Sequence, residues 1–453
     1  GKERLYKPLW MRAFRFIELA IETKEEPLII NDYYNIAVSA PVEKKSNFYT
    51  SNTLYNQVMD VCWRTASICL QDNLVSDAYY EQMQYVGDSK VHTETLIALT
   101  GDSLFLKNAL VQFNQSRLPD GNILSCYPLK ATFMHPTFTL IHIDMIYEYM
   151  MNFGNKQFIR QFLPGIFSTL FWFENHIDSK TGMVGYSNEY LFVDWFKKET
   201  QRAKIINSGN AAVVTLHYAF TLKNLAKIYD YLGMYEESAR SLRRADELTK
   251  AVNNNCYDPK RKYFFDDINK THADQRPNIM AVLTDAVPKE EQKNLIERIL
   301  NDTTLDEATY YYRYYYFLAL RKAGAGNMFD KVLKPWDDKV IKMGLTTTPE
   351  RFYDQRSDAH PWSTAPAFAF FHVLCGIAPA SPGFKTVEIA PQFGSLNEVK
   401  ADMVHPKGMI KMSVKKDAKG NLSGEISLPT ELSGILKWRG SEILLKEGVN
   451  KIN

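Results

Sequence analysis

Residues 210–254 read NAAVVTLHYAFTLKNLAKIYDYLGMYEESARSLRRADELTKAVNN, and this stretch indicates the fold of the chain. Apolar residues recur every three or four positions on both sides of Leu232-Gly233-Met234, which is the spacing of one helix face. Gly233 permits the positive φ that commonly ends a helix. Because the connection is so short, the two helices are predicted to pack as an antiparallel hairpin.

The same pattern continues along most of the chain, with further short glycine turns at Gly101, Gly154 and Gly324. The periodicity predicts helices near residues 51–71, 87–100, 103–116, 136–153, 155–176, 210–232, 234–254, 274–285, 288–300, 308–323, 325–338 and 363–375. These segments form six pairs. Six hairpins either continue as an open solenoid or close into a toroid.

The long loops favour closure. A solenoid repeats at a fixed length, whereas here irregular segments of very different length separate the pairs, at 117–135, 177–209, 255–273 and 339–362. The prediction is therefore a mainly α protein built on an (α/α)6 six-hairpin toroid. Long loops on a regular scaffold usually build a site, and these loops are rich in aromatic and acidic residues.

Both ends of the chain read as β structure. Runs at 14–22, 27–30 and 33–39 predict a partial N-terminal β segment, the remnant of a β-sandwich domain. After Cys375, proline and glycine punctuate short alternating runs such as 409–414, which predict a small C-terminal antiparallel β domain. The predicted domains are residues 1–48, 49–378 and 379–453.

Composition excludes several classes of function. The 453 residues carry 54 Lys+Arg against 52 Asp+Glu, a net charge of +2, so no basic field points to nucleic acid. No stretch approaches the roughly 20 apolar residues of a spanning helix. Five scattered cysteines predict buried thiols rather than a disulfide framework. The opening residues hold no signal sequence, and we expect an export signal and upstream domains to have been removed.

Two carboxylates seven positions apart, Glu81 and Asp88, lie among aromatic residues in the loop before a predicted helix. An apolar surrounding raises the pKa of a carboxyl group, which suits a general acid. The structural alternative stays open: Asp88 caps the helix and Glu81 pairs with an arginine.

A second cluster places Glu350 in a stiff Thr/Pro loop, followed by Asp358 and His360. In a closed toroid the last hairpin lies beside the first, so Glu350 is predicted to face Glu81 across one cavity. Glycoside hydrolysis uses such a pair, and inverting enzymes separate the two carboxyl groups by roughly 6.5–9.5 Å. The alternative for His360 is a purely structural histidine.

Several motifs together resemble the family 78 glycoside hydrolases, the α-L-rhamnosidases. They are Tyr79-Tyr80-Glu81-Gln82, Gln84-Tyr85-Val86-Gly87-Asp88, Phe192-Val193-Asp194-Trp195, Leu345-Thr346-Thr347, Arg356-Ser357-Asp358, His360 and Pro382-Gly383-Phe384-Lys385. The resemblance implies an (α/α)6 barrel flanked by β-sandwich domains, with hydrolysis that inverts the anomeric centre. It implies a substrate with terminal α-L-rhamnose or a related deoxyhexose, in a glycoside, oligosaccharide or polysaccharide. It also implies a bacterial, periplasmic or secreted protein that uses no cofactor.

The resemblance also implies roles for individual residues. Glu81 matches the general acid and Glu350 matches the general base. The matched sugar-binding residues are the carboxylates Asp88 and Asp194, the aromatic walls Tyr85 and Trp195, and His360 as a hydroxyl-binding group.

One departure from the family pattern lies five residues before the acid. The family has Asp-Cys-Pro there, and its Asp binds sugar hydroxyls, whereas this chain has Ser76-Asp77-Ala78. A shift of one residue moves a side chain by about 3.5 Å, so Asp77 takes the same place only in a rearranged loop. Ser76 still offers a hydroxyl, and both residues are candidate substrate contacts.

Neither a metal nor a cofactor is expected. His135 and His142 share a helix face without a third ligand at metal-site spacing, and no phosphate-binding motif occurs. Two other functions stay open. One is a glycan-binding or catalytically weakened homologue, suggested by Ser76, and the other is a polysaccharide lyase on a similar toroid. The acidic character of the matched loops disfavours the lyase.

Overall fold

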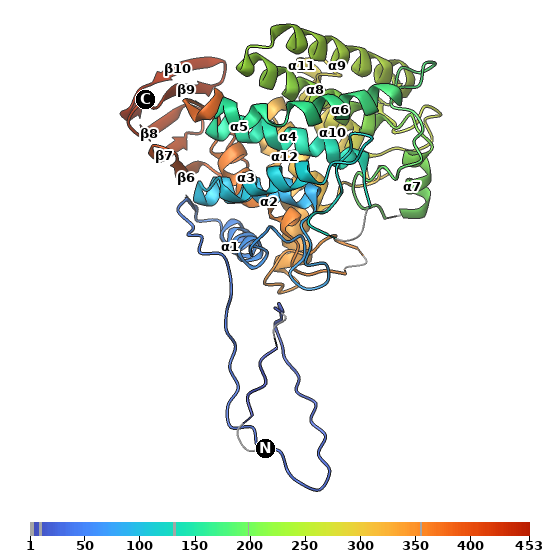
Figure 1. Ribbon diagram of the computed structural model, residues 1–453. Helices are drawn as coiled ribbons and strands as arrows, with labels where there is room; N and C mark the ends of the chain where they lie inside the picture. The colour runs from blue at the N-terminus through green and yellow to red at the C-terminus, as the bar shows by residue number, and fades with distance from the viewer. Residues whose placement is uncertain (1–3, 9–10, 130–132, 198, 354–355) are drawn as a thin grey trace.

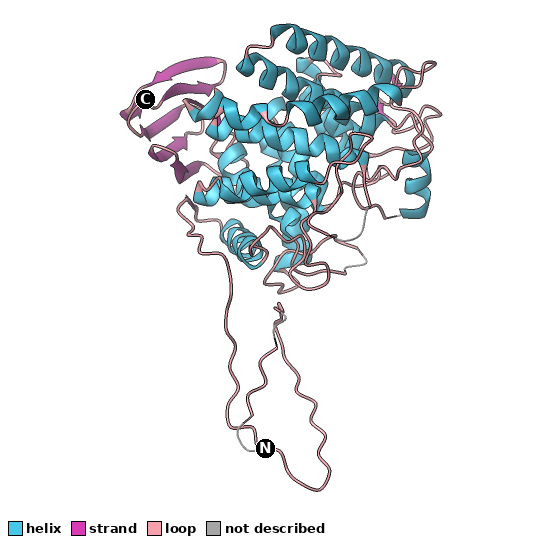
Figure 2. Ribbon diagram, viewed as in Figure 1, coloured by secondary structure: helices cyan, strands magenta, loops and turns pink. Residues whose placement is uncertain are grey.

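The computed structural model describes residues 4–8, 11–129, 133–197, 199–353 and 356–453. A helical body carries strands at one corner and a long extended segment at the N-terminal end (Figure 1, Figure 2). The helices of the described ranges are α1 (Thr53–Ile68), α2 (Val86–Thr100), α3 (Leu104–Gln115), α4 (Pro136–Phe153), α5 (Lys156–Arg160), α6 (Leu163–Asn175), α7 (Glu199–Asn207), α8 (Ala212–Leu232), α9 (Tyr235–Cys256), α10 (Gln275–Thr284), α11 (Lys289–Asn301), α12 (Tyr310–Ala323), α13 (Phe329–Trp336) and α14 (Ala365–Ala369).

Six of these helices close into an inner ring. Contacts run from α2 to α4, α8, α10, α12, α14 and back to α2. Six further helices pack outside them: α1 lies against α14, α3 and α6 against α4, α9 against α8, α11 against α10 and α12, and α13 against α12. This closed ring of outer and inner helices confirms the predicted six-hairpin toroid.

Burial distinguishes the inner helices from the outer ones. Every residue of α2 and α10 is buried, as expected for helices with neighbours on all sides. In α9 the buried positions recur every three or four residues, whereas the other face carries charges such as Glu237 and Arg244. The predicted helix 155–176 divides into α5 and α6 because Pro164, near the start of α6, lacks the amide hydrogen that a continuous helix needs.

The C-terminal residues form two packed sheets. One has the order β1-β6-β7-β8-β11 and the other the order β10-β9-β5-β4. Their bounds are β1 (Asn47–Tyr49), β4 (Ile377–Pro379), β5 (Thr386–Ile389), β6 (Glu398–His405), β7 (Gly408–Lys416), β8 (Leu422–Leu428), β9 (Ser433–Trp438), β10 (Ser441–Leu445) and β11 (Gly448–Ile452); β2 (Tyr257–Asp258) and β3 (Tyr263–Phe264) pair separately. The predicted sheet is antiparallel except for one parallel pair, β5 with β9.

The predicted N-terminal strands are wrong. Within 4–8 and 11–46 the structure assigns no strand, and apolar side chains such as Phe16 and Ile29 are exposed. A strand needs a neighbour that pairs with its backbone and a face to bury, and this segment has neither among the described residues. β1 alone forms, because it pairs with β6 of the C-terminal sheet, with Phe48 opposite Ala401.

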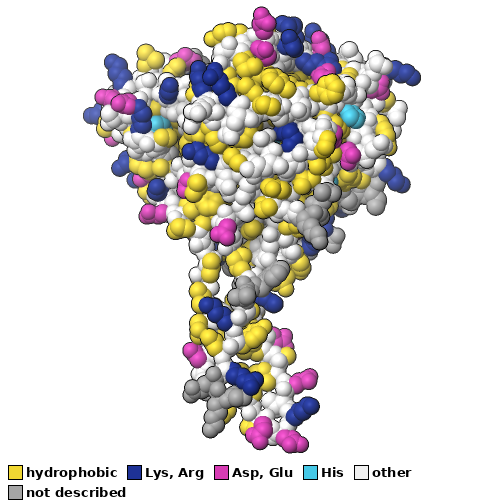
Figure 3. Space-filling view, in the orientation of Figure 1, with side chains coloured by type: hydrophobic (Ala, Val, Ile, Leu, Met, Phe, Trp, Pro, Cys, Tyr) yellow, Lys and Arg dark blue, Asp and Glu magenta, His cyan; other side chains and the backbone are white. Residues whose placement is uncertain are grey.

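The extended segment still contacts the body at its start. Nε2 of the Gln82 side chain donates to the carbonyl of Met11 at 3.1 Å, and Nη1 of Arg15 donates to the carbonyl of Gly344 at 3.1 Å. Beyond these contacts the segment loops away from the helices, with apolar and charged side chains interspersed along it (Figure 3). The predicted boundaries at 48/49 and 378/379 stay predictions.

Candidate active site

Hydrogen bonds between Asp77 and the backbone that follows it fix the loop that carries Glu81. Oδ1 of Asp77 accepts from the amides of Tyr79 and Tyr80 at 2.6 and 3.0 Å, and the carbonyl of Asp77 accepts from the amide of Gln82 at 2.9 Å. Asp77 thus closes a tight turn and presents Glu81 at its end. Oδ2 of Asp77 is buried and has no hydrogen-bond partner among the described residues.

Ser76 supports the carboxylate of Glu81 directly. Its Oγ lies 3.0 Å from Oε2 of Glu81 and 2.6 Å from the carbonyl oxygen of Met83. Ser76, which departs from the family pattern, therefore contacts the candidate acid Glu81.

Glu350 is held by the loop between α13 and α14. Its amide donates to the carbonyl of Ser357 at 3.0 Å, and its carbonyl accepts from Nε1 of Trp362 at 2.8 Å. The amide of His360 donates to the carbonyl of Thr348 at 2.8 Å. Only 1% of Glu350 is exposed, so its carboxylate is positioned by the loop and not by solvent.

Arg356 joins the two candidate catalytic carboxylates. Its Nη2 donates to Oε1 of Glu81 and, at 3.3 Å, to Oε1 of Glu350, while its Nε donates to Oε2 of Glu350 at 3.3 Å. Burial alone would lower the pKa of Arg356, but the bonds to Glu350 and Glu81 outweigh it and raise the pKa. Both acids therefore lie in one site, as predicted, and the predicted alternative of a Glu81–arginine pair also holds.

Asp88 and His360 form a buried pair beside these acids. Nε2 of His360 lies 2.7 Å from Oδ1 of Asp88, and Nδ1 lies 3.4 Å from Oγ of Ser357. Burial raises the pKa of Asp88 to about 6 against the opposing attraction of His360. Burial would lower the pKa of His360, but Asp88 outweighs it and the pKa rises to about 9. Around neutral pH the two groups form an ion pair. Asp88 lies in the first turn of α2 without capping it, since Tyr85 is the N-cap residue.

Aromatic side chains surround the acids. The guanidinium of Arg351 lies 4.5 Å from the ring centroid of Trp195, and Nε1 of Trp195 has no hydrogen-bond partner among the described residues. The ring of Trp362 lies 4.6 Å from that of His360. Tyr85 is half-buried, and burial followed by the charge of Glu81 raises its pKa.

Asp194 belongs to a buried ionic network. Its Oδ2 accepts from Nε of Arg276 at 2.7 Å and from the amide of Thr309 at 3.0 Å, and the hydroxyl of Thr309 bonds Oδ1. Arg276 also donates to the carbonyl of Trp195 at 2.8 Å and pairs with Asp274. Burial raises the pKa of Asp194 although Arg276 and Thr309 oppose it. In this arrangement Asp194 orders the segment that carries Trp195.

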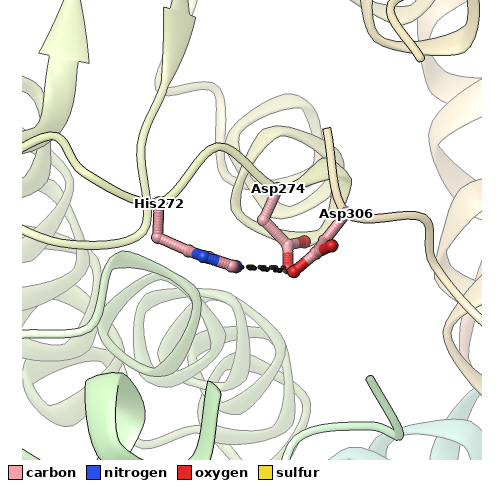
Figure 4. A group of neighbouring side chains, drawn as sticks. All are labelled: His272, Asp274 and Asp306. Atoms are coloured by element: carbon pink, nitrogen blue, oxygen red, sulfur yellow. Dashed lines mark ion pairs between the residues drawn. The ribbon is translucent and has the colours of Figure 1, made fainter. Parts of the chain in front are cut away.

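The network continues to a group of three side chains, His272, Asp274 and Asp306. Their possible ligand atoms all lie within 4.8 Å of one another, and Figure 4 shows the histidine ring directed at the two carboxylates. Nε2 of His272 lies 2.9 Å from Oδ2 of Asp306, and Arg276 Nη1 lies 3.0 Å from Oδ2 of Asp274. Asp306 thus contacts His272, and Asp274 contacts the guanidinium of Arg276.

The structure brings Glu81, Glu350, Asp88, His360 and Ser76 together through the contacts above. Asp77 faces its own loop, and Asp194 is buried behind Trp195. Sequence reasoning gave no role to Arg356, although it stands in the quoted Arg356-Ser357-Asp358 motif. It missed Arg276 altogether, because an arginine inside a helix start carries no local signal of a buried charge.

The comparisons with known proteins identify the family and the fold. The profile of the bacterial alpha-L-rhamnosidase 6 hairpin glycosidase domain matches residues 43–374, and that of the bacterial alpha-L-rhamnosidase C-terminal domain matches residues 376–451. No curated protein sequence matches.

Solved structures share the fold at low identity. The GH78 family rhamnosidase of Bacillus sp. GL1 is 22% identical with a TM-score of 0.78, covering 88% of this chain and 43% of that chain. The α-L-rhamnosidase of Aspergillus terreus is 16% identical with a TM-score of 0.77, covering 92% and 51%. That of Streptomyces avermitilis, complexed with L-rhamnose, is 15% identical with a TM-score of 0.75, covering 90% and 42%.

The chain spans about half the length of these proteins. None of the helices in the described ranges combines the length and the apolar surface needed to cross a bilayer. The matched profiles extend over both the helical ring and the sheets that follow it. The chain therefore belongs to the bacterial α-L-rhamnosidase family, with a six-hairpin glycosidase domain followed by the C-terminal domain of that family.

Proposed function

We propose that the chain hydrolyses terminal α-L-rhamnosyl or related deoxyhexosyl residues of glycosides, oligosaccharides or polysaccharides, with inversion at the anomeric carbon. The observation that carries this proposal is the shared contact of Glu81 and Glu350 with Arg356, since 275 positions separate Glu81 from that arginine. Hydrolysis of a glycosidic bond requires two carboxyl groups in one site, and here the fold brings them together from distant parts of the chain.

In the proposed reaction Glu81 donates its proton to the departing glycosidic oxygen. Glu350 takes a proton from a water molecule, whose oxygen attacks the anomeric carbon from the opposite face. The bond from that carbon to the leaving oxygen breaks as the new bond to water forms. The products are the free alcohol and the sugar of inverted configuration.

Arg356 has to withdraw for this reaction to occur. Two hydrogen bonds to one nitrogen keep the nearest oxygens of Glu81 and Glu350 within about 6 Å. An inverting pair stands roughly 6.5–9.5 Å apart, with a water molecule between. The guanidinium also favours the ionised form of Glu81, whereas a general acid has to carry its proton. Substrate binding is therefore coupled to displacement of the guanidinium.

The other candidate residues are proposed to bind the sugar or to position groups that do. Asp88 and His360 are proposed to bind hydroxyls as an ion pair, and Trp195 and Tyr85 to provide aromatic walls. Trp195 also offers its indole N–H as a donor. Asp194 acts through Arg276, which holds the backbone of Trp195 in place.

Glu81→Gln and Glu350→Gln test the roles on two α-L-rhamnosides, an alkyl glycoside and an aryl glycoside with a good leaving group. Both variants are expected to lose about 10²–10⁴-fold in kcat/KM on the alkyl substrate. On the aryl substrate the loss shrinks for Glu81→Gln alone, because a good leaving group needs no proton. Glu290→Gln, on the exposed surface of α11, is the control. Near-full activity of either active-site variant contradicts the assignment.

The configuration of the product tests the mechanism separately. Proton NMR of the first-formed sugar is expected to show the β-anomer from an α-L-rhamnoside. A first-formed α-anomer indicates retention and removes Glu350 from the role of general base.

A second candidate function is glycan binding with weakened catalysis. The observation that favours it lies in the acid loop, where the hydroxyl of Ser76 is engaged by Glu81 and Met83 and Asp77 faces its own turn. Ser76 has no carboxylate, and Oδ1 of Asp77 is used by the amides of its own turn while its Oδ2 is buried. Saturable binding of L-rhamnose without any turnover of rhamnosides over days supports this function instead.

A further inference from the structure

A cavity of about 350 Å³, open to solvent, lies where the C-terminal sheets meet the helical ring, and neither Glu81 nor Glu350 lines it. It is lined by the loop after α12, by α11, and by the loops around β5, β7 and β9. Its lining includes three cations, Lys293, Lys416 and Arg439, and two aromatic residues, Phe393 and Trp438, but no Asp or Glu. A volume of this size suits a small ligand such as one or two sugar rings.

The cations of this cavity are available to a ligand. In the described part of the chain, none of the three forms an ion pair. Lys293 and Arg439 are exposed and Lys416 is half-buried. Three unneutralised positive charges around one hollow favour an anionic ligand.

Several contacts order the side chains that line the cavity. Nζ of Lys416 lies 5.1 Å from the ring centroid of Phe393, which places the ammonium group by a cation–π contact. Nη1 of Arg439 donates to the carbonyl of Lys419 at 2.8 Å, and Nε1 of Trp438 donates to the carbonyl of Gly420 at 3.0 Å. These bonds hold the guanidinium and the indole in fixed places, so a ligand meets groups that are already ordered.

The aromatic pair supplies the second recognition element. Phe393 and Trp438 lie edge to face with centroids 5.5 Å apart, and Trp438 keeps part of its surface exposed. An exposed indole beside polar groups suits the apolar face of a pyranose ring. Inorganic anions would leave both the indole and most of the volume unused.

The opposite wall is formed by uncharged residues around Gly326 and Gln392. The amide of Gly326 donates to Oε1 of Gln392 at 2.7 Å, and a Cβ at Gly326 would meet Gln392 at 2.3 Å. The helix α12 ends here, and the carbonyls of Leu320 and Arg321 in its last turn accept from the amides of Gly324 and Ala325. These bonds satisfy part of the negative end of the helix, which reduces its opposition to an anion.

From these contacts we propose that the cavity between the helical ring and the C-terminal sheets binds an acidic saccharide, such as the uronate end of a glycan. The carboxylate of the sugar lies against Lys293, Lys416 and Arg439, and a ring face lies on Trp438. A nucleotide is disfavoured because the chain lacks a glycine-rich phosphate-binding motif. This binding site does not depend on hydrolysis at Glu81 and Glu350.

Calorimetry on the full chain tests the proposal with four probes: trigalacturonate, its neutral counterpart galactotriose, sodium sulfate and AMP. Saturable binding of trigalacturonate that weakens as salt is raised is the expected result, because salt screens the exposed charges. Binding of galactotriose with equal affinity overturns the role of charge. Equal or tighter binding of sulfate or AMP overturns the saccharide assignment.

Two variants locate the binding. Lys293→Gln and Lys416→Gln are each expected to weaken trigalacturonate binding by about three- to tenfold, as lost charge-assisted contacts do. Their matched controls, Lys289→Gln on α11 and Lys411→Gln on β7, lie on the same elements outside the cavity and leave affinity unchanged. All four keep wild-type activity on an aryl rhamnoside, or the wild-type lack of it. No binding, or equal effects of test and control variants, overturns the proposal.

Discussion

The hydroxyl of Ser76 lies 3.0 Å from Oε2 of Glu81, so the residue that departs from the family pattern supports the candidate acid. The same hydroxyl lies 2.6 Å from the carbonyl of Met83, which fixes its orientation. Ser76 is therefore a positioning residue for Glu81 in this structure, whether or not it also meets a sugar.

Replacing Ser76 by alanine tests this relationship. Ser76→Ala is expected to lower kcat on an alkyl rhamnoside by about tenfold, with a smaller change in KM, because a misplaced acid affects proton transfer more than binding. The loss should shrink on a substrate with a good leaving group. Ser208→Ala, on the exposed surface, is the control. A rise in KM at constant kcat would identify Ser76 as a substrate contact instead.

Arg356 is the next target, because it occupies the space between the two acids. Arg356→Gln is expected to tighten L-rhamnose binding a few-fold, since the sugar no longer displaces a guanidinium from Glu81 and Glu350. It is also expected to lower the free energy of unfolding by about 1 kcal/mol, a modest loss because the side chain is 44% exposed. Titration calorimetry and urea unfolding measure the two effects.

Arg64→Gln is the matched control for Arg356. Arg64 donates to the carbonyl of Thr346 in the same loop region but touches neither acid, so its variant should leave rhamnose affinity unchanged. A tenfold or larger loss of affinity in Arg356→Gln would mean that the guanidinium binds the sugar itself.

The Asp88–His360 pair predicts a pH dependence of stability. The pKa of His360 is about 9 in the folded protein, against about 6.5 in an unfolded chain. The folded state therefore holds more protons between these values, and the free energy of unfolding falls as pH rises from 6.5 to 9. Urea unfolding across this range should show the decline in the wild type and lose much of it in His360→Asn.

A second histidine variant controls for nonspecific effects of pH. His405 lies in the C-terminal sheets, and burial lowers its pKa, so its titration falls outside this range. His405→Asn is expected to shift stability at every pH while keeping the decline between 6.5 and 9. An unchanged decline in His360→Asn would assign it to other groups.

The network around Arg276 predicts a larger loss. Arg276→Met leaves the buried carboxylates of Asp194 and Asp274 without their guanidinium, and an uncompensated buried charge costs about 3–5 kcal/mol. Urea unfolding measures the loss, with Arg240→Met on the exposed face of α9 as the control. A change below 1 kcal/mol would show that the network contributes little to the fold.

The sequence predicted the helices because their signals are local. Apolar spacing and glycine stops predicted helices at 136–153 and 210–232, which lie within two residues of the observed bounds, and the varied loop lengths favoured a closed ring. The helix α7 inside the loop 177–209 was missed, because its residues 199–207 are polar and lack a strong apolar face.

The predicted N-terminal strands are wrong because strand formation depends on residues outside the segment. Alternation at 14–39 resembles a strand locally, but a strand forms only with a partner for its backbone, and such a partner cannot be read from the segment itself. Phe48 has a strand partner because folding places it beside Ala401, more than 350 residues later in the sequence.

By itself, the sequence determined most of the helices and their closure into a ring, the family motifs and the candidate carboxylates Glu81 and Glu350. The tertiary structure alone decided that Arg356 stands between Glu81 and Glu350, that Ser76 supports the acid and that Asp194 is committed to Arg276. Periodicity reports only what a residue and its near neighbours prefer. Charges that meet from distant parts of the chain depend on how the ring closes, because only closure removes water and brings them within hydrogen-bonding distance.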